Sequence, residues 1–142
     1  MAETFETNED VEIGDLLVMD SRHPNMLKKS RQSFDKNVIG IVSGAPAVLM
    51  AGDQLQVAPE PFKFEKGRKP PVALSGRVLC KISLENGSIE VGDLLTSSST
   101  PGHAMKADDW DKSFGTIIGK ALEPFNSKDK KLGTIMVMVT RQ

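Results

Sequence analysis

The sequence has few of the residue types that enzymes use for catalysis. It contains two histidines, one cysteine, one tryptophan and no tyrosine in 142 residues. The single cysteine, Cys80, excludes an internal disulfide framework and a multi-cysteine zinc site, because each of these needs at least two thiols. We therefore expect neither a cofactor nor a metal, and the composition leans against an enzyme.

An excess of charge of one sign and long apolar runs are also missing. The chain has 18 basic and 19 acidic residues and a net charge of -1. It therefore lacks the basic footprint of a nucleic-acid-binding protein, and we expect no nucleic-acid partner. No apolar run approaches the roughly 20 residues that span a bilayer. The acidic start of the chain lacks the apolar stretch of a signal peptide, so we expect no signal peptide in this chain and no membrane span.

The residues that are present alternate mainly with a period of two. In residues 78–84 the side chains of Val78, Cys80, Ile82 and Leu84 share one face, which is typical of a half-buried strand. Cys80 is thus predicted to be a small buried residue and not a reactive thiol. Further strands are predicted at residues 13–19, 38–43, 47–50, 54–58, 72–75, 89–96, 115–122 and 132–140. Only residues 30–36 and 108–114 could form a helical turn. The pattern predicts an all-β chain.

Two turns and a proline-rich segment punctuate these strands. Asn86-Gly87 predicts a type I′ hairpin between residues 78–84 and the strand from Ile89, since both residues tolerate positive φ. A polar loop at residues 126–130 predicts a second hairpin, between residues 117–122 and 132–140. Residues 59–71 are rich in proline and charge, which is typical of an exposed, extended arm.

The arm and the last strand supply the candidate interface residues. Phe62 and Phe64 in the arm could anchor on a neighbouring subunit, or they could cover the end of the chain's own barrel. The last strand has apolar residues on both faces, with Met136 and Met138 on one of them. That strand is therefore predicted either to be covered on both sides or to face a partner chain.

The most informative feature is an internal repeat. The segment Val-Glu-Ile-Gly-Asp-Leu-Leu at residues 11–17 recurs as Ile-Glu-Val-Gly-Asp-Leu-Leu at residues 89–95. Each copy continues with a proline-containing loop, an aromatic-Asp-Lys triplet and a glycine-containing strand. One such unit cannot bury its own apolar face, whereas two packed units can. We therefore predict one β domain over residues 1–142, a compact barrel or sandwich made of repeat A (about 11–43), the arm (about 59–71), repeat B (about 89–123) and the strand at 132–140.

Few residues are candidates for chemistry. Ser99 or Thr100 with His103 could supply a nucleophile and its base, although Ser, Thr, Pro and Gly are also ordinary loop residues. Three aspartates surround Trp110, but they lack the calcium-loop spacing, so the interpretation is a solvated turn with Trp110 pointing into the core. One tryptophan and no tyrosine do not favour a sugar-binding platform.

Several segments carry a family resemblance, namely residues 2–6, 71–78, 85–96, 100–106 and 118–123. Together they resemble a module found near the ends of phage tail-fibre-like and bacterial surface proteins. The Gly-Asp-Leu-Leu and Ile-Gly-Lys-Ala-Leu-Glu segments are also similar to small trimeric β-barrels that decorate phage heads. The resemblance implies a β-rich, trimeric component of a fibre or particle. Some related terminal modules cleave themselves after assembly.

These observations lead to three functional hypotheses. The first is a non-enzymatic structural module that assembles as a homotrimer or onto a larger phage-like particle. The second is a self-processing terminal domain that uses Ser99 or Thr100 with His103. The third is a module that binds glycans or another surface. The corresponding location is a virion, an extracellular particle or a cell surface.

Overall fold

The computed structural model describes residues 1–44, 48–51, 54–57 and 69–140. As predicted, the described elements are nearly all strands, with one short helix, α1, at Trp110–Ser113. In chain order the strands are β1 (Ala2–Thr4), β2 (Glu6–Thr7), β3 (Leu16–Met19), β4 (Met26–Lys29), β5 (Val38–Val42), β6 (Val48–Ala51), β7 (Gln54–Val57), β8 (Pro71–Ala73), β9 (Gly76–Ser83), β10 (Leu94–Ser97), β11 (Ala104–Lys106), β12 (Ile117–Ala121) and β13 (Leu132–Val139). Among the described residues no helix is long and apolar enough to cross a membrane.

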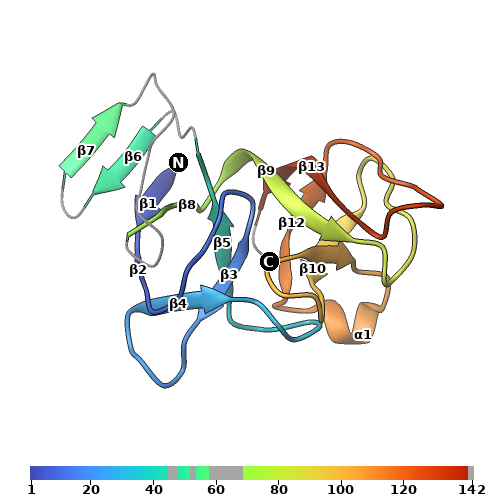
Figure 1. The fold of residues 1–142 in the computed structure, drawn as a ribbon, viewed down its shortest axis with the longest axis horizontal. Coiled ribbons are helices and arrows are strands. Elements are labelled where there is room, and N and C mark those ends of the chain that lie inside the picture. The colour runs from blue at the N-terminus through green and yellow to red at the C-terminus, as the bar shows by residue number, and fades with distance from the viewer. Residues whose placement is uncertain (45–47, 52–53, 58–68, 141–142) are drawn as a thin grey trace.

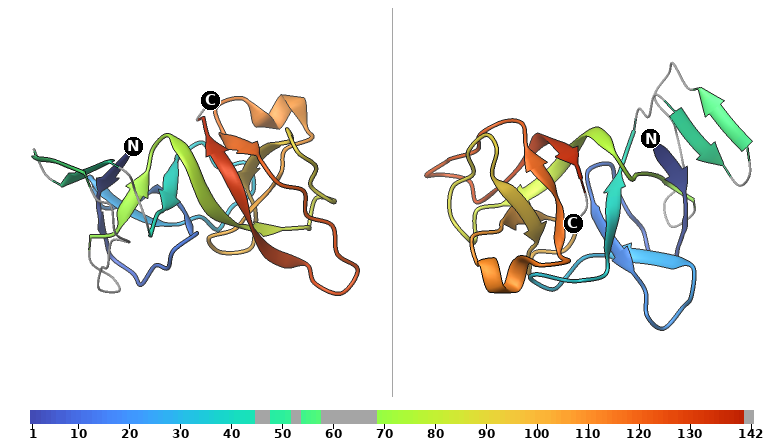
Figure 2. Two further views of the ribbon diagram at one scale, coloured as in Figure 1. Left: turned by 90° about the horizontal axis from the view of Figure 1, so that it is seen from above. Right: turned by 180° about the vertical axis from the view of Figure 1, so that it is seen from behind.

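The strands form two sheets that lie side by side (Figures 1 and 2). The first has eight strands in the order β2-β4-β3-β5-β8-β1-β6-β7, and we call it the sheet half. The second, the barrel half, closes in the order β10-β11-β9-β13-β12. Only Phe5 separates β1 from β2, so the chain of pairings from β2 through β4, β3, β5 and β8 returns to the segment where it started. The sequence predicted a barrel or a sandwich, and the barrel half has the predicted barrel.

Repeat A and repeat B have the same strand pairing. β3 pairs antiparallel with β4 and β5, just as β10 pairs antiparallel with β11 and β12. The β3–β5 pairing shifts register between Leu17 and Val18, and the β10–β12 pairing shifts between Leu95 and Thr96. These are the residues that the sequence repeat aligns. A parallel neighbour completes each unit, because β2 pairs with β4 as β9 pairs with β11.

The Gly-Asp motif makes the same turn in both repeats. The Asp15 carboxylate accepts a hydrogen bond of 2.7 Å from the backbone N–H of Glu12, and Asp93 accepts one of 2.8 Å from Glu90. The glycine before each aspartate has a φ of 94° or 92°. A side chain at that position would be strained, since this is the left-handed region that favours glycine. The motif is therefore a compact turn that leads into β3 or β10.

A single apolar cluster joins the two halves. Leu16, Val18 and Val38 of the sheet half belong to the same buried cluster as the barrel residues Ile82 and Leu95. A smaller cluster, which includes Val11, Leu17 and Leu27, fills the other face of the sheet half. Cys80 is fully buried, as predicted, and this burial raises the pKa of its thiol to about 12. The last strand buries Ile135, Val137 and Val139, again as its alternation predicts.

Several local expectations were wrong. The strand at residues 78–84 does not form a hairpin with the segment from Ile89; β9 pairs instead with β13, and Ile89 bridges Phe125. In the Asn86-Gly87 turn only Gly87 has positive φ, so the turn is not type I′. Residues 30–36 form turns without a helix. By contrast, the second hairpin is confirmed, because β12 pairs antiparallel with β13.

The equivalent glycines of the two repeats provide a test of the shared packing. A Cβ at Gly40 would collide with the carbonyl oxygen of Ala73, and one at Gly119 would collide with that of Met138. We predict that Gly40→Ala and Gly119→Ala each lower the free energy of unfolding by about 1–3 kcal/mol in urea denaturation. The control is Gly44→Ala, whose Cβ meets only the exposed side chain of Ile13; it should cost less than about 0.5 kcal/mol. Equal costs at all three positions would contradict the prediction.

Candidate assembly interface

The loop that carries the candidate nucleophiles is held by a carboxylate. Ser99 donates a hydrogen bond from Oγ to Glu85 Oε2 at 2.6 Å, and Thr100 donates from Oγ1 to Glu85 Oε1 at 3.0 Å. The backbone N–H of Ser99 and the hydroxyl of Ser83 also donate to Glu85. Glu85 follows β9, so these bonds tie the loop after β10 to the end of a neighbouring strand. Sequence reasoning missed Glu85, because nothing in its local pattern distinguishes it from other exposed acids.

These contacts change the acidity of Glu85. Partial burial opposes its ionisation, but the hydrogen bonds from Ser99, Thr100 and Ser83 outweigh burial and lower the pKa of Glu85 to about 2. The carboxylate is consequently charged at neutral pH and is a weak base. Glu85 is therefore better suited to holding the loop in place than to activating a hydroxyl as a base. We call these hydrogen bonds from Ser83, Ser99 and Thr100 to Glu85 the Glu85 staple.

His103 does not join these hydroxyls. Its Nδ1 lies 2.8 Å from the carbonyl oxygen of Pro101, to which a protonated nitrogen donates. The structure therefore brings Ser99 and Thr100 together on Glu85 and directs His103 to its own loop backbone. Within the described ranges, no group of three or more His, Cys, Asp or Glu side chains is arranged to hold a metal ion.

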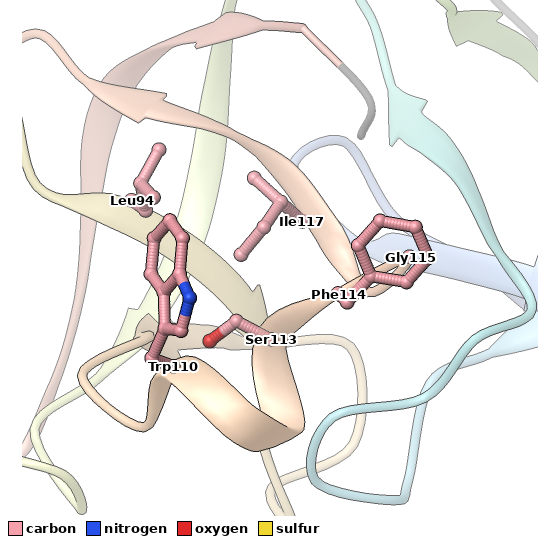
Figure 3. A pocket seen from close by; sticks show the side chains of 6 residues that line it. All are labelled: Leu94, Trp110, Ser113, Phe114, Gly115 and Ile117. Atoms are coloured by element: carbon pink, nitrogen blue, oxygen red, sulfur yellow. The ribbon is translucent and has the colours of Figure 1, made fainter.

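The largest exposed apolar side chains lie at α1. Trp110 is 82% exposed and Phe114 is 93% exposed. With Leu94 and Ile117 they line a shallow apolar pocket on the barrel half, which we call the aromatic patch (Figure 3). In Figure 3 the indole of Trp110 stands beside Leu94, and the Phe114 ring lies across the pocket from it.

The exposure of Trp110 corrects the expectation that it points into the core. α1 is a single turn whose start is capped by Asp109, which accepts hydrogen bonds from the backbone N–H groups of Asp111 and Lys112. Only Ser113 of this turn is buried, and its hydroxyl bonds back to the carbonyl oxygen of Asp109. The turn therefore directs its one small residue inward and its indole outward. Aliphatic side chains from the strands already fill the interior, so the core does not require an aromatic ring.

A second apolar surface lies on the outer face of β9 and β13. Met136 is paired with Leu79, which is 45% exposed, and both line a shallow groove with Ile13. Met138, also partly exposed, is paired with Arg77. The predicted interface residues of β13 are thus placed together on one face of the barrel. Phe62 and Phe64, the other two predicted interface residues, lie outside the described residues.

The comparisons with known proteins show a likeness of fold. No family model and no curated protein sequence matches the chain. The C-terminal fragment of bacteriophage phi29 gene product 12 is similar with a TM-score of 0.64 and 16% identity over 99% of both chains. The bacteriophage phi29 head fiber gp8.5 N base is similar with a TM-score of 0.51 and 17% identity over 99% of this chain and 94% of that one. Pre-mature phi29 gene product 12 gives a TM-score of 0.59 and 17% identity over 99% of this chain and 21% of that one.

These neighbours agree with the resemblance seen in the sequence. Two phage proteins, one of them a head fiber, contain this fold over nearly the whole length of the present chain. The resemblance to modules of phage appendages is therefore confirmed at the level of the fold. Identities this low carry no residue roles from those proteins to this one.

The Glu85 staple predicts a specific acid sensitivity. Because the pKa of Glu85 is lower in the folded chain than in the unfolded one, its stabilising contribution is present above about pH 5 and is lost as the pH falls toward 2. We predict that Glu85→Gln lowers the free energy of unfolding at pH 7 and makes it fall less steeply between pH 5 and 2. Denaturant unfolding across that range measures both effects. Glu90→Gln, at another exposed carboxylate, is the matched control; identical pH slopes for Glu85→Gln and the parent would refute the staple.

Proposed function

We propose that this chain is a structural module that assembles with further copies of itself, as a component of a phage-appendage-like particle. The observation that carries the proposal is the aromatic patch. Two large rings, Trp110 and Phe114, are almost fully exposed at the end of a scaffold whose interior is already filled. The fold, which phage appendage structures share, supports the particle as the setting.

Exposed aromatic side chains have a strong physical reason to be covered. Each aromatic residue buries roughly 150–250 Å² when it is enclosed, and apolar burial stabilises by roughly 25 cal/mol per Å². Trp110 and Phe114 alone would thus contribute several kcal/mol to an interface. Tryptophan is also among the residue types that are enriched at interface hot spots. A folded monomer gains nothing from leaving both rings in water.

The finer parts of the proposal concern the number of copies and the contacts. We propose a homotrimer, the state that the sequence resemblance implies, located in a virion or on an extracellular particle. In this assembly the groove with Leu79 and Met136, together with Met138 on the same face, forms a second contact. Phe62 and Phe64 in the proline-rich arm contribute to holding the neighbouring copy. We also propose that repeats A and B are duplicates of one β unit within a single domain.

The mass of the native assembly tests this proposal. We predict a molar mass of about 46 kDa, three times 15.4 kDa, by size-exclusion chromatography with light scattering. Leu79→Asp with Met136→Asp should lower that mass, because it places charge on the apolar groove. Leu132→Asp is the control: Leu132 lies on the same strand and is 44% exposed, but it lies outside the groove. A parent chain that stays strictly monomeric at micromolar concentration would refute assembly.

A further inference from the structure

The counterpart of the aromatic patch in repeat A is already covered, and repeat B covers it. Gly102 of repeat B is inserted between two strands of repeat A. Its carbonyl oxygen accepts a hydrogen bond of 2.9 Å from the backbone N–H of Leu16, and its own N–H donates to the carbonyl oxygen of Ser30 at 2.9 Å. A Cβ on Gly102 would collide with the Asp15 carboxylate, so the insertion is closely fitted.

Ser97 makes the second part of this contact. Its hydroxyl donates to the carbonyl oxygen of Gln32 at 2.6 Å and accepts from the backbone N–H of Asp35 at 2.8 Å. Its carbonyl oxygen accepts from Phe34 N–H at 3.2 Å. Phe34 stands in repeat A where Trp110 stands in repeat B. The loop at residues 97–103 therefore packs against the turn of repeat A that carries Phe34.

The two repeats differ in burial at this surface. Gly14, Asp15, Leu16 and Ser30 are buried in repeat A. Their counterparts in repeat B, listed in the same order, are all partly or fully exposed: Gly92, Asp93, Leu94 and Ala107. The local hydrogen bonding is the same, since Ser30 N–H donates to Leu16 and Ala107 N–H donates to Leu94. In the described part of the chain, however, no residue bridges Leu94 N–H and the Ala107 carbonyl as Gly102 bridges the first pair.

Repeat A carries a loop of the matching shape, and among residues 1–44, 48–51, 54–57 and 69–140 that loop has no comparable docking. Asn25 has a φ of 71° and stands at the position of Gly102, whose φ is 74°. Both loops close with the same bonds, from Met26 N–H to His23 and from His103 N–H to Thr100, each at 3.1 Å. Residues 21–25 are all exposed. The Asp20 carboxylate holds this loop in shape by accepting hydrogen bonds from Asn8 Nδ2 and from the backbone N–H of Arg22.

We propose that the loop at residues 20–26 of a second copy docks on the aromatic patch of repeat B, with Asn25 inserted between Leu94 and Ala107. The contact within one chain is thus repeated between chains, head to tail, with one difference: the Asn25 side chain requires the carboxylate of Asp93 to move aside, which is possible because Asp93, unlike Asp15, is partly exposed. This inference rests on the proposed function and specifies which surfaces meet. Because the two surfaces differ, the interface is heterologous and extends around a ring that closes, as in a trimer, or along a filament that does not.

Charge supports the same pairing. The docking loop carries Arg22, and the strand that follows it carries Lys28 and Lys29. The receiving surface carries the exposed Asp108 and Asp111 on either side of Trp110. The exposed Arg22 can therefore approach the exposed carboxylates beside Trp110, whereas a patch-to-patch contact would bring identical carboxylates together, which favours this orientation of the second copy.

Complementation between two variants distinguishes a head-to-tail contact from a symmetric one. The receiver variant carries Trp110→Ser and Phe114→Ser. The donor variant carries Arg22→Asp and Asn25→Asp, because aspartate tolerates the positive φ of Asn25. All four side chains are exposed, so the fold should persist, which circular dichroism checks. We expect each variant alone to lose at least about 30-fold in self-association, as measured by sedimentation, while Leu132→Ser assembles like the parent.

Mixing the two variants gives the decisive result. Each retains one intact surface, so we expect a 1:1 complex of about 31 kDa, twice 15.4 kDa, at concentrations where neither variant associates alone. Variants that still assemble like the parent, or a mixture that stays monomeric throughout a concentration series, would overturn the inference while leaving assembly itself intact. A monomeric parent would instead refute the proposed function.

A disulfide provides a second measurement. A Cβ at Gly102 would lie 3.5 Å from the Cβ of Asp15, which is within the Cβ separation that a disulfide spans. Since Asn25 and Asp93 are the equivalent pair between two copies, we expect Asn25→Cys chains mixed with Asp93→Cys chains to give a covalent dimer under mild oxidation. Cys80 is fully buried and should not interfere. Leu132→Cys in place of Asp93→Cys is the control, and equal yields from both mixtures would contradict the docking.

Discussion

The insertion of one residue, Gly102, between β3 and β4 is the contact on which the arrangement of the two halves depends. The backbone of Gly102 makes two hydrogen bonds with repeat A, in place of bonding between the two strands of a regular ladder. Gly102 also rests against the buried carboxylate of Asp15. That carboxylate is paired with Lys81 of β9, whose Nζ lies 2.8 Å from Oδ1. A buried charge is costly unless it is paired, so this ion pair couples the sheet half to the barrel half.

The same contact explains why the two repeats differ in exposure although they share one conformation. Repeat A has a neighbour along the chain that occupies the space between Leu16 and Ser30, and none of the residues that the structure describes occupies the equivalent space in repeat B. An end that is left open by tandem packing is either capped or used for association. A cap would carry polar side chains, whereas α1 carries exposed rings, and this difference supports the proposed association. The proposed function thus rests on a position that is filled in repeat A and open in the described part of repeat B.

The repeat and the strands could be predicted because their signals are local. The Gly-Asp-Leu-Leu motif and the alternation around Cys80 and Ile135 are visible without tertiary information, and both have the predicted structure. Strands β1, β2, β4 and β11 were missed, because they are two to four residues long and owe their conformation to pairing with distant segments. The Asn86-Gly87 hairpin failed for the same reason: pairing of β9 with β13 over eight residues outweighs a favourable turn sequence. The direction of Trp110 and the role of Glu85 depend on neighbours that no sequence window contains.

Trp110 is the only tryptophan in the chain, so its fluorescence reports directly on the aromatic patch. The measurement is the emission maximum and the acrylamide quenching of the unmodified protein across a dilution series, recorded together with its molar mass. We predict that emission shifts to shorter wavelength and quenching falls as the mass rises, because assembly removes the indole from water. An assembled protein whose tryptophan stays fully quenchable would contradict the claim that copies meet at the aromatic patch.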